Sequence, residues 1–111
     1  MKIGKFVVQQ GDVLIEECDG IPKDARKLSR DADGAVVLAR GEVTGHRHAI
    51  YDADGVEIFD AGNGNSYIRV SRSVRLEHEE HGVAIINPGT YQVRGVQEYD
   101  HFAEEARRVI D

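Results

Sequence analysis

The stretch VEIFDAGNGNSYIRV, residues Val56–Val70, shows in miniature how this chain is built. Its two ends, Val56-Glu57-Ile58-Phe59 and Tyr67-Ile68-Arg69-Val70, are rich in β-branched and aromatic residues. Between them lies Ala61-Gly62-Asn63-Gly64-Asn65, a cluster of residues that favour turns. Short β-type runs bounded by Gly and Asn clusters predict strands joined by turns.

The same pattern extends in both directions along the chain. An Asp54-Gly55 pair precedes Val56, which predicts a hairpin between the run at 46–51 and the run at 56–59. Further runs occupy residues 6–8, 12–15, 35–39, 74–76, 83–86 and 91–96. Eight or nine short strands at fairly regular spacing predict an all-β fold, a small single-domain barrel or sandwich spanning residues 1–111.

Two segments depart from this pattern. Residues Asp19–Gly34 are polar and highly charged, and predict a long loop with room for one helical turn. The C-terminal residues predict a short helix, with Asp100 as N-cap and Phe102, Ala106 and Val109 on one face.

Composition excludes several classes of function. The 111 residues include 14 Lys plus Arg and 20 Asp plus Glu, a net charge of −6. This balance argues against nucleic acid or an anionic membrane as partner. The single cysteine, Cys18, excludes an internal disulfide and a Cys-rich zinc module. Because apolar runs are short and no secretory signal is evident, we expect a cytoplasmic protein.

Five histidines are the main indication of function, and four of them form two pairs. His46 and His48 are separated by one residue, so on a strand both side chains point to the same face. His78 and His81 flank Glu79-Glu80, where a turn can direct both imidazoles toward one point. Zn²⁺, Fe²⁺, Ni²⁺ and Cu²⁺ accept such nitrogen ligands, so we predict a divalent transition metal, with Zn, Fe, Ni and Mn as candidates.

Nearby acids suit proton transfer or further ligation. Glu79 and Glu80 are the candidate catalytic acid–base residues, whereas Asp52 and Glu42 are candidate additional ligands or hydrogen-bond partners of an imidazole. His101 lies in a charged segment, which favours an ordinary surface histidine. Surface hydrogen bonding is also the alternative interpretation of the two pairs, because spacing alone does not show that they meet.

The stretch Gly41-Glu42-Val43-Thr44-Gly45-His46-Arg47-His48 resembles the first motif of the cupins, small β-barrels with a metal-binding H-x-H pair. Residues Gly82–Tyr91, an apolar run followed by Pro88-Gly89, are similar to the second cupin motif. The resemblance implies a metal held by histidines and a carboxylate, and a homodimer. The sequence departs from cupins at the ligands: Asp52 stands near the position of the usual glutamate, and Gln92 and Val93 stand where the third histidine is expected.

The chain also resembles small uncharacterised bacterial, phage- or plasmid-associated proteins, through Gln10–Val13, Gly41–His46 and His78–Tyr91. Two functions therefore stay open. The first is a metal-binding domain, either structural or a metal-dependent enzyme acting on a small molecule. The second is a non-catalytic acidic module that binds a protein partner, as an accessory factor of a mobile element, with a histidine-based pH switch as its variant.

Overall fold

Ten β-strands form the described part of the chain in a computed structural model, which describes residues 7–40, 46–62 and 65–95. The strands are β1 (Val7–Gln10), β2 (Val13–Glu17), β3 (Arg26–Lys27), β4 (Val36–Arg40), β5 (Arg47–Ile50), β6 (Val56–Asp60), β7 (Ser66–Val70), β8 (Val74–Leu76), β9 (Ala84–Ile86) and β10 (Gly89–Gly95). The all-β fold predicted from the sequence is confirmed.

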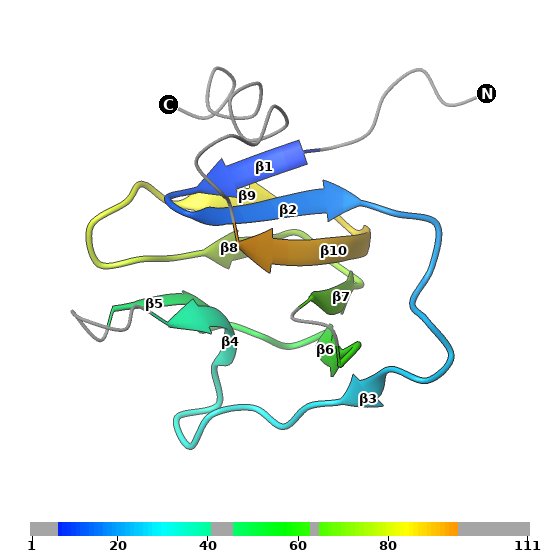
Figure 1. Cartoon of the computed structure of the whole chain (residues 1–111). Helices are drawn as coiled ribbons and strands as arrows, with labels where there is room; N and C mark the ends of the chain where they lie inside the picture. The colour runs from blue at the N-terminus through cyan, green and yellow to red at the C-terminus, as the bar shows by residue number, and fades with distance from the viewer. Residues whose placement is uncertain (1–6, 41–45, 63–64, 96–111) are drawn as a thin grey trace.

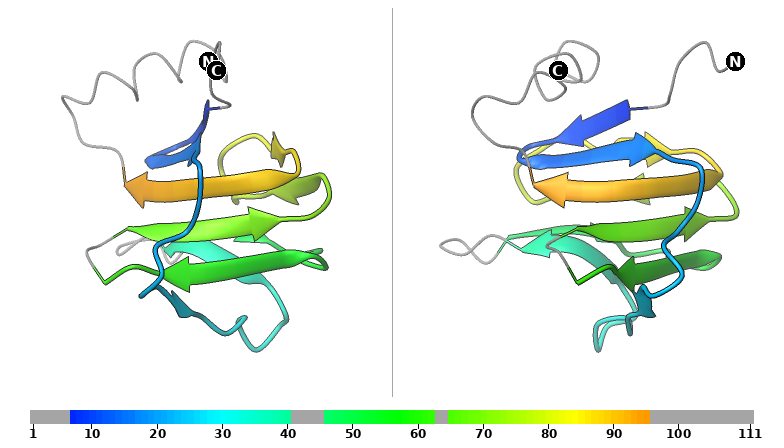
Figure 2. Two further views of the ribbon diagram at one scale, coloured as in Figure 1. Left: turned by 90° about the vertical axis from the view of Figure 1, so that its right-hand side faces the viewer. Right: turned by 45° about the vertical axis from the view of Figure 1, so that its right-hand side comes forward.

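The strands form three sheets arranged as an open sandwich (Figure 1). The large sheet has the order β1-β2-β10-β7-β6-β3, and every neighbouring pair is antiparallel. The hairpins β4–β5 and β8–β9 form the second layer, behind the large sheet (Figure 2). Of the two architectures predicted, the sandwich is therefore the one observed, and no closed barrel forms among the described strands.

The core lies between these two layers. Alternation along each strand places one face inward, as in β7, where Ile68 and Val70 are buried and Arg69 is exposed. Tyr91 and Val93 of β10 point to the same interior. Burying an aliphatic or aromatic side chain of this size stabilises a fold by about 1.5–3 kcal/mol, so this inward face holds the two layers together.

Strand β3 is the one strand that the sequence did not predict, because Arg26 and Lys27 are charged and lie inside the expected loop. Both side chains are exposed at the edge of the large sheet and pair with acids of β6. Arg26 lies 3.5 Å from Asp60, and Lys27 lies 3.0 Å from Glu57. Charged residues are typical of a short edge strand.

The prediction of a hairpin at Asp54-Gly55 is wrong. Strand β5 pairs with β4, and β6 pairs with β7 and β3, so this turn carries the chain from one layer to the other. Arg72 fixes the crossing by donating hydrogen bonds to the carbonyls of Asp52 and Asp54. The turn residues were recognised correctly, but turn chemistry does not determine which strands pair.

Several predictions fall outside the described residues: the C-terminal helix, His101, Glu42 and the remainder of Gly41–Gly45. Within residues 7–40, 46–62 and 65–95, no helix is long and apolar enough to cross a membrane.

Candidate functional site

Two backbone hydrogen bonds bring the histidine pairs together. Ala49 of β5 and Glu77, which follows β8, exchange N–H···O bonds of 2.9 and 2.8 Å. This isolated bridge joins the two hairpins of the second layer at the point where His48 precedes Ala49 and His78 follows Glu77. The pairs, about thirty residues apart in sequence, therefore lie side by side.

The four imidazoles form one cluster. The ring of His78 is central, with its centroid 4.3 Å from that of His48, 4.6 Å from that of His81 and 5.4 Å from that of His46. The rings of His48 and His81 lie 6.0 Å apart. All four histidines of the two predicted pairs therefore belong to this cluster.

The cluster lines a cavity of about 330 Å³, here called the histidine pocket, formed by Gly11, Asp12, His46, His48, His78, Glu80 and His81. The β1–β2 turn, with Gly11 and Asp12, forms the part of the wall that the histidine loops do not. Gly11 has a φ of +57°, the left-handed region that a tight hairpin turn requires and that glycine adopts without strain. A Cβ at Gly11 would lie 2.5 Å from Nε2 of His81, so a side chain at this position would require the exposed His81 ring to move.

Gln10 determines which nitrogen of His48 faces the pocket. The amide nitrogen of Gln10 donates to the carbonyls of Leu76 and Gly82, both at 2.9 Å. Its amide oxygen, 2.8 Å from Nδ1 of His48, must therefore accept, and Nδ1 must carry the proton. In the neutral ring, Nε2 then holds a lone pair.

That lone pair faces a carboxylate. Nε2 of His48 lies 3.2 Å from Oδ1 of Asp12, whose side chain is 84% exposed while that of His48 is 4% exposed. Burial, together with the charge that His78 can carry, lowers the pKa of His48, although Asp12 opposes this shift. When His48 is neutral, its Nε2 and the Asp12 carboxylate present two acceptors to each other, an arrangement that a cation would stabilise.

His78 is oriented by its own loop. Its Nδ1 accepts N–H bonds from Glu80 at 3.0 Å and His81 at 3.3 Å. Partial burial, and then the charge of His81, lower the pKa of His78 and favour its neutral form. Coordination through Nε2 would require a proton on Nδ1, so ion binding at His78 is coupled to the loop 78–81.

The two predicted acid–base residues occupy different positions. Oε1 of Glu79 accepts the backbone N–H of Arg47 at 3.0 Å, which holds the pKa of Glu79 below its usual range. Candidate ligand atoms of His46, His78 and Glu79 all lie within 4.8 Å of one another. Oε1 of Glu80 lies 3.2 Å from Nδ1 of His46, at the wall of the histidine pocket.

Asp52 does not reach the pocket. Its carboxylate lies 2.8 Å from Arg72, so the prediction of Asp52 as a ligand or an imidazole partner is wrong. The sequence reasoning missed Gln10, Gly11 and Asp12, although it had singled out the Gln10–Val13 stretch. Two consecutive glutamines next to a Gly-Asp turn were the available signal, and the structure buries both, Gln9 at 4% and Gln10 at 1% exposure.

Comparison with known proteins identifies a family but no activity. Neither the curated proteins nor the solved structures contain a match to this chain. A family model described as a domain of unknown function, DUF8820, matches residues 9–96. This match runs from within β1 to the end of β10 and includes all four clustered histidines, and the chain therefore belongs to the DUF8820 family.

Proposed function

We propose that this protein binds a divalent transition-metal ion in the histidine pocket. The observation that carries the proposal is the approach of His48 Nε2, the ring nitrogen that Gln10 leaves unprotonated in the neutral imidazole, to Oδ1 of Asp12 at 3.2 Å. Around a tetrahedral ion with bonds of about 2.0–2.1 Å, ligand atoms lie roughly 3.3 Å apart. The exposed Asp12 side chain can turn to admit an ion and then bind it.

The surrounding residues supply further donors. His78 lies at the centre of the cluster, nearer to His48 and His81 than these two are to each other, and candidate ligand atoms of His46 and Glu79 lie within 4.8 Å of one on His78. Gln10 behaves as an outer partner that fixes the tautomer of a metal-binding imidazole. Within residues 7–40, 46–62 and 65–95, the pocket offers nitrogen and oxygen donors and no thiolate, which suits Zn²⁺, Fe²⁺, Ni²⁺ or Mn²⁺.

The resemblance to cupins supports the same proposal, because the H-x-H pair of the first motif is the pair that enters the pocket. If the metal retains an open position, it supplies Lewis-acid chemistry or an activated water. For such a reaction Glu80 is the better proton carrier, since it lines the pocket, whereas the Arg47 N–H keeps Glu79 ionised. A small-molecule substrate and a homodimer are parts of the proposal that rest on the resemblance.

Metal titration of tag-free, metal-stripped protein by calorimetry tests the proposal. We expect one Zn²⁺ or Ni²⁺ per chain, with at least tenfold weaker binding in the His46→Ala/His48→Ala double variant. Asp52→Asn is the matched control, because Asp52 is an acidic residue paired with Arg72 outside the pocket. Asp12→Asn should weaken binding while leaving the fold intact, since the side chain is mostly exposed.

Absence of binding in the wild type, or equal affinity in the double variant, would reject the metal site. The acidic protein-binding module would then be the remaining function, and isolation of a stable, metal-independent partner from native host extract would support it.

A further inference from the structure

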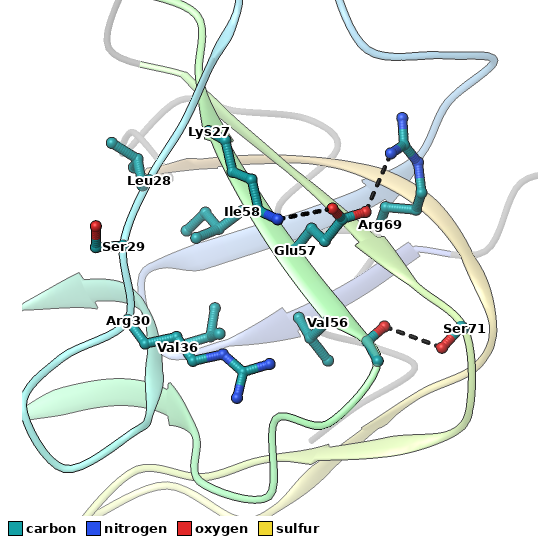
Figure 3. A pocket seen from close by; sticks show the side chains of 11 residues that line it. Lys27, Leu28, Ser29, Arg30, Val36, Val56, Glu57, Ile58, Arg69 and Ser71 are labelled. Carbon is teal, nitrogen blue, oxygen red and sulfur yellow. Dashed lines mark hydrogen bonds and ion pairs between the residues drawn. The ribbon is translucent and has the colours of Figure 1, made fainter.

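A charged segment, residues 26–34 and here called the strap, joins the large sheet to β5. Its first half is fixed along β6. Nζ of Lys27 lies 3.0 Å from the carboxylate of Glu57 (Figure 3), and the backbone N–H of Leu28 donates to the carbonyl of Ile58 at 2.8 Å. The strap therefore starts from a fixed position on the large sheet.

The second half of the strap is a turn that closes on itself. The N–H of Gly34 donates to the carbonyl of Asp31 at 2.8 Å, and the N–H of Asp31 donates to the carbonyl of Ala35 at 2.9 Å. The N–H of Ala35 in turn donates to Oδ1 of Asp33 at 3.1 Å. These bonds hold two carboxylates, those of Asp31 and Asp33, in a defined arrangement.

Both carboxylates bind one arginine of β5. Nη1 of Arg47 donates to Asp31 and Nη2 donates to Asp33, each at 2.8 Å, and Nη2 also lies 3.2 Å from the hydroxyl of Tyr51. The Arg47 side chain is only 18% exposed. Charge-assisted bonds joined in a network hold a side chain better than an isolated surface ion pair does. The strap is therefore anchored to β5 at Arg47.

Arg47 begins β5 and directly follows His46. The last Cα pair of the β4–β5 ladder joins Arg40 to Arg47, so His46 precedes the ladder, whereas the bridge made by Ala49 fixes β5 further along. On the side of the histidine loops, Glu79 accepts the backbone N–H of Arg47 at 3.0 Å. The strap and the loop thus hold Arg47 together, and its position sets that of the preceding residue.

We propose that Arg47, held by the strap, is a positioning residue for His46 in the histidine pocket. The inference rests on the proposed metal site, because its effect is on the affinity for the ion. Alternation along β5 directs the Arg47 side chain away from the pocket, which it does not line. The ring of His46 meets that of His78 edge-on, with centroids 5.4 Å apart. Gln10 orients His48 separately, so the strap acts on one histidine of the H-x-H pair.

Loss of the anchor should weaken ion binding through His46 alone. We expect Arg47→Gln to lower the affinity for Zn²⁺ by about tenfold, as for other residues that orient a metal ligand. His46→Ala should also lower it. The His46→Ala/Arg47→Gln double variant should bind no more weakly than His46→Ala, because residues that act as one unit are not additive.

A second variant changes the strap and leaves β5 intact. Asp31→Asn/Asp33→Asn removes both charges that bind Arg47, while the amide oxygen of an asparagine at position 33 can still accept the N–H of Ala35. This variant should reproduce the loss seen in Arg47→Gln. Arg72→Gln is the matched control and should bind as the wild type does, since Arg72 pairs with Asp52 outside the histidine pocket.

Calorimetric titration of the full-length, metal-stripped proteins with Zn²⁺ measures these affinities. NMR of the metal-free proteins adds a readout that needs no ion: ring protons of His46 and His78 should show a nuclear Overhauser effect in the wild type that is lost in Arg47→Gln. Unchanged affinity in Arg47→Gln, additive losses in the double variant, or a retained Overhauser effect would overturn the inference and leave the metal site standing. A wild type that binds no ion would instead reject the metal site and this inference together.

Discussion

The amide oxygen of Gln10 lies 2.8 Å from Nδ1 of His48, and this contact determines which nitrogen of the buried neutral imidazole holds the free lone pair. Gln10 has no freedom to reverse its amide, because its nitrogen is bound to two carbonyls, those of Leu76 and Gly82. The carbonyls of Leu76 and Gly82 thus orient Gln10 of the large sheet, and Gln10 in turn orients His48.

Replacing Gln10 by methionine tests this orientation. Gln10→Met keeps the side-chain length but leaves the carbonyls of Leu76 and Gly82 without their donor. We expect a loss of about 1–3 kcal/mol in the free energy of unfolding, measured by urea denaturation. The ¹⁵N shifts of the His48 ring should show a mixture of tautomers, and metal affinity should fall by about 10–100-fold. A His48 ring that keeps its proton on Nδ1 in the variant would contradict this role.

Gly11→Ala should damage the histidine pocket directly. The new methyl group would lie 2.5 Å from Nε2 of His81 and would also strain a backbone with φ of +57°. Gly34→Ala separates the two effects, because Gly34 has a φ of +85° and nothing within 4 Å of its Cβ position. Strain alone should cost about 1–2 kcal/mol in thermal or chemical unfolding. We expect Gly11→Ala to cost more, and only Gly11→Ala to weaken metal binding; equal losses in both would show that His81 yields without cost.

Arg47 connects β5 to the charged loop, and replacing Arg47 should change the pKa of Asp33. Its guanidinium lies 2.8 Å from Asp31 and 2.8 Å from Asp33, and its hydrogen bond to Asp33 is the main cause that lowers the pKa of Asp33. A lowered carboxyl pKa adds stability above the unfolded value of 3.8, and this stability is lost as pH falls through the folded pKa. In Arg47→Gln, NMR titration should show the pKa of Asp33 raised toward that value. Arg72→Gln, by contrast, should leave the titration of Asp33 as it is in the wild type.

Adjacent residues of β9 should differ strongly in their contribution to stability. Ile86 is 0% exposed in the core, whereas Ile85 is 49% exposed. Ile86→Ala should therefore cost about 2–5 kcal/mol in the free energy of unfolding. Ile85→Ala removes the same atoms from a largely exposed position and should cost well under half as much. Similar losses for both variants would mean that the outer face of β9 is covered in solution.

Much of the site could be anticipated from local sequence. The single residue between His46 and His48 fixes their common face on a strand, and both rings do approach His78. The glycine at position 82 and the acids between His78 and His81 indicated a turn, and backbone N–H groups of that turn do close onto His78. These relationships depend on neighbours within a few residues, so a pattern of residues is enough to predict them.

Other parts depend on contacts between distant segments. Gln10 and Asp12 lie more than thirty residues before His48, and nothing in their own neighbourhood marks them as its partners. The error at Asp54-Gly55 has the same origin, because the turn is local whereas the choice between β4 and β6 as the partner of β5 is not.

The all-β chain of short strands and the two histidine pairs at chelating spacing follow from the residue pattern alone, because the period of a strand and the preferences of turn residues are local properties. Tertiary structure decided that Ala49 would bridge to Glu77 and that the β1–β2 turn would face the same space. It also left β4 and β6 in separate sheets. Sheet pairing buries one face of every strand at once, so the position of the histidine pocket follows from the packing of the whole core and not from any single stretch.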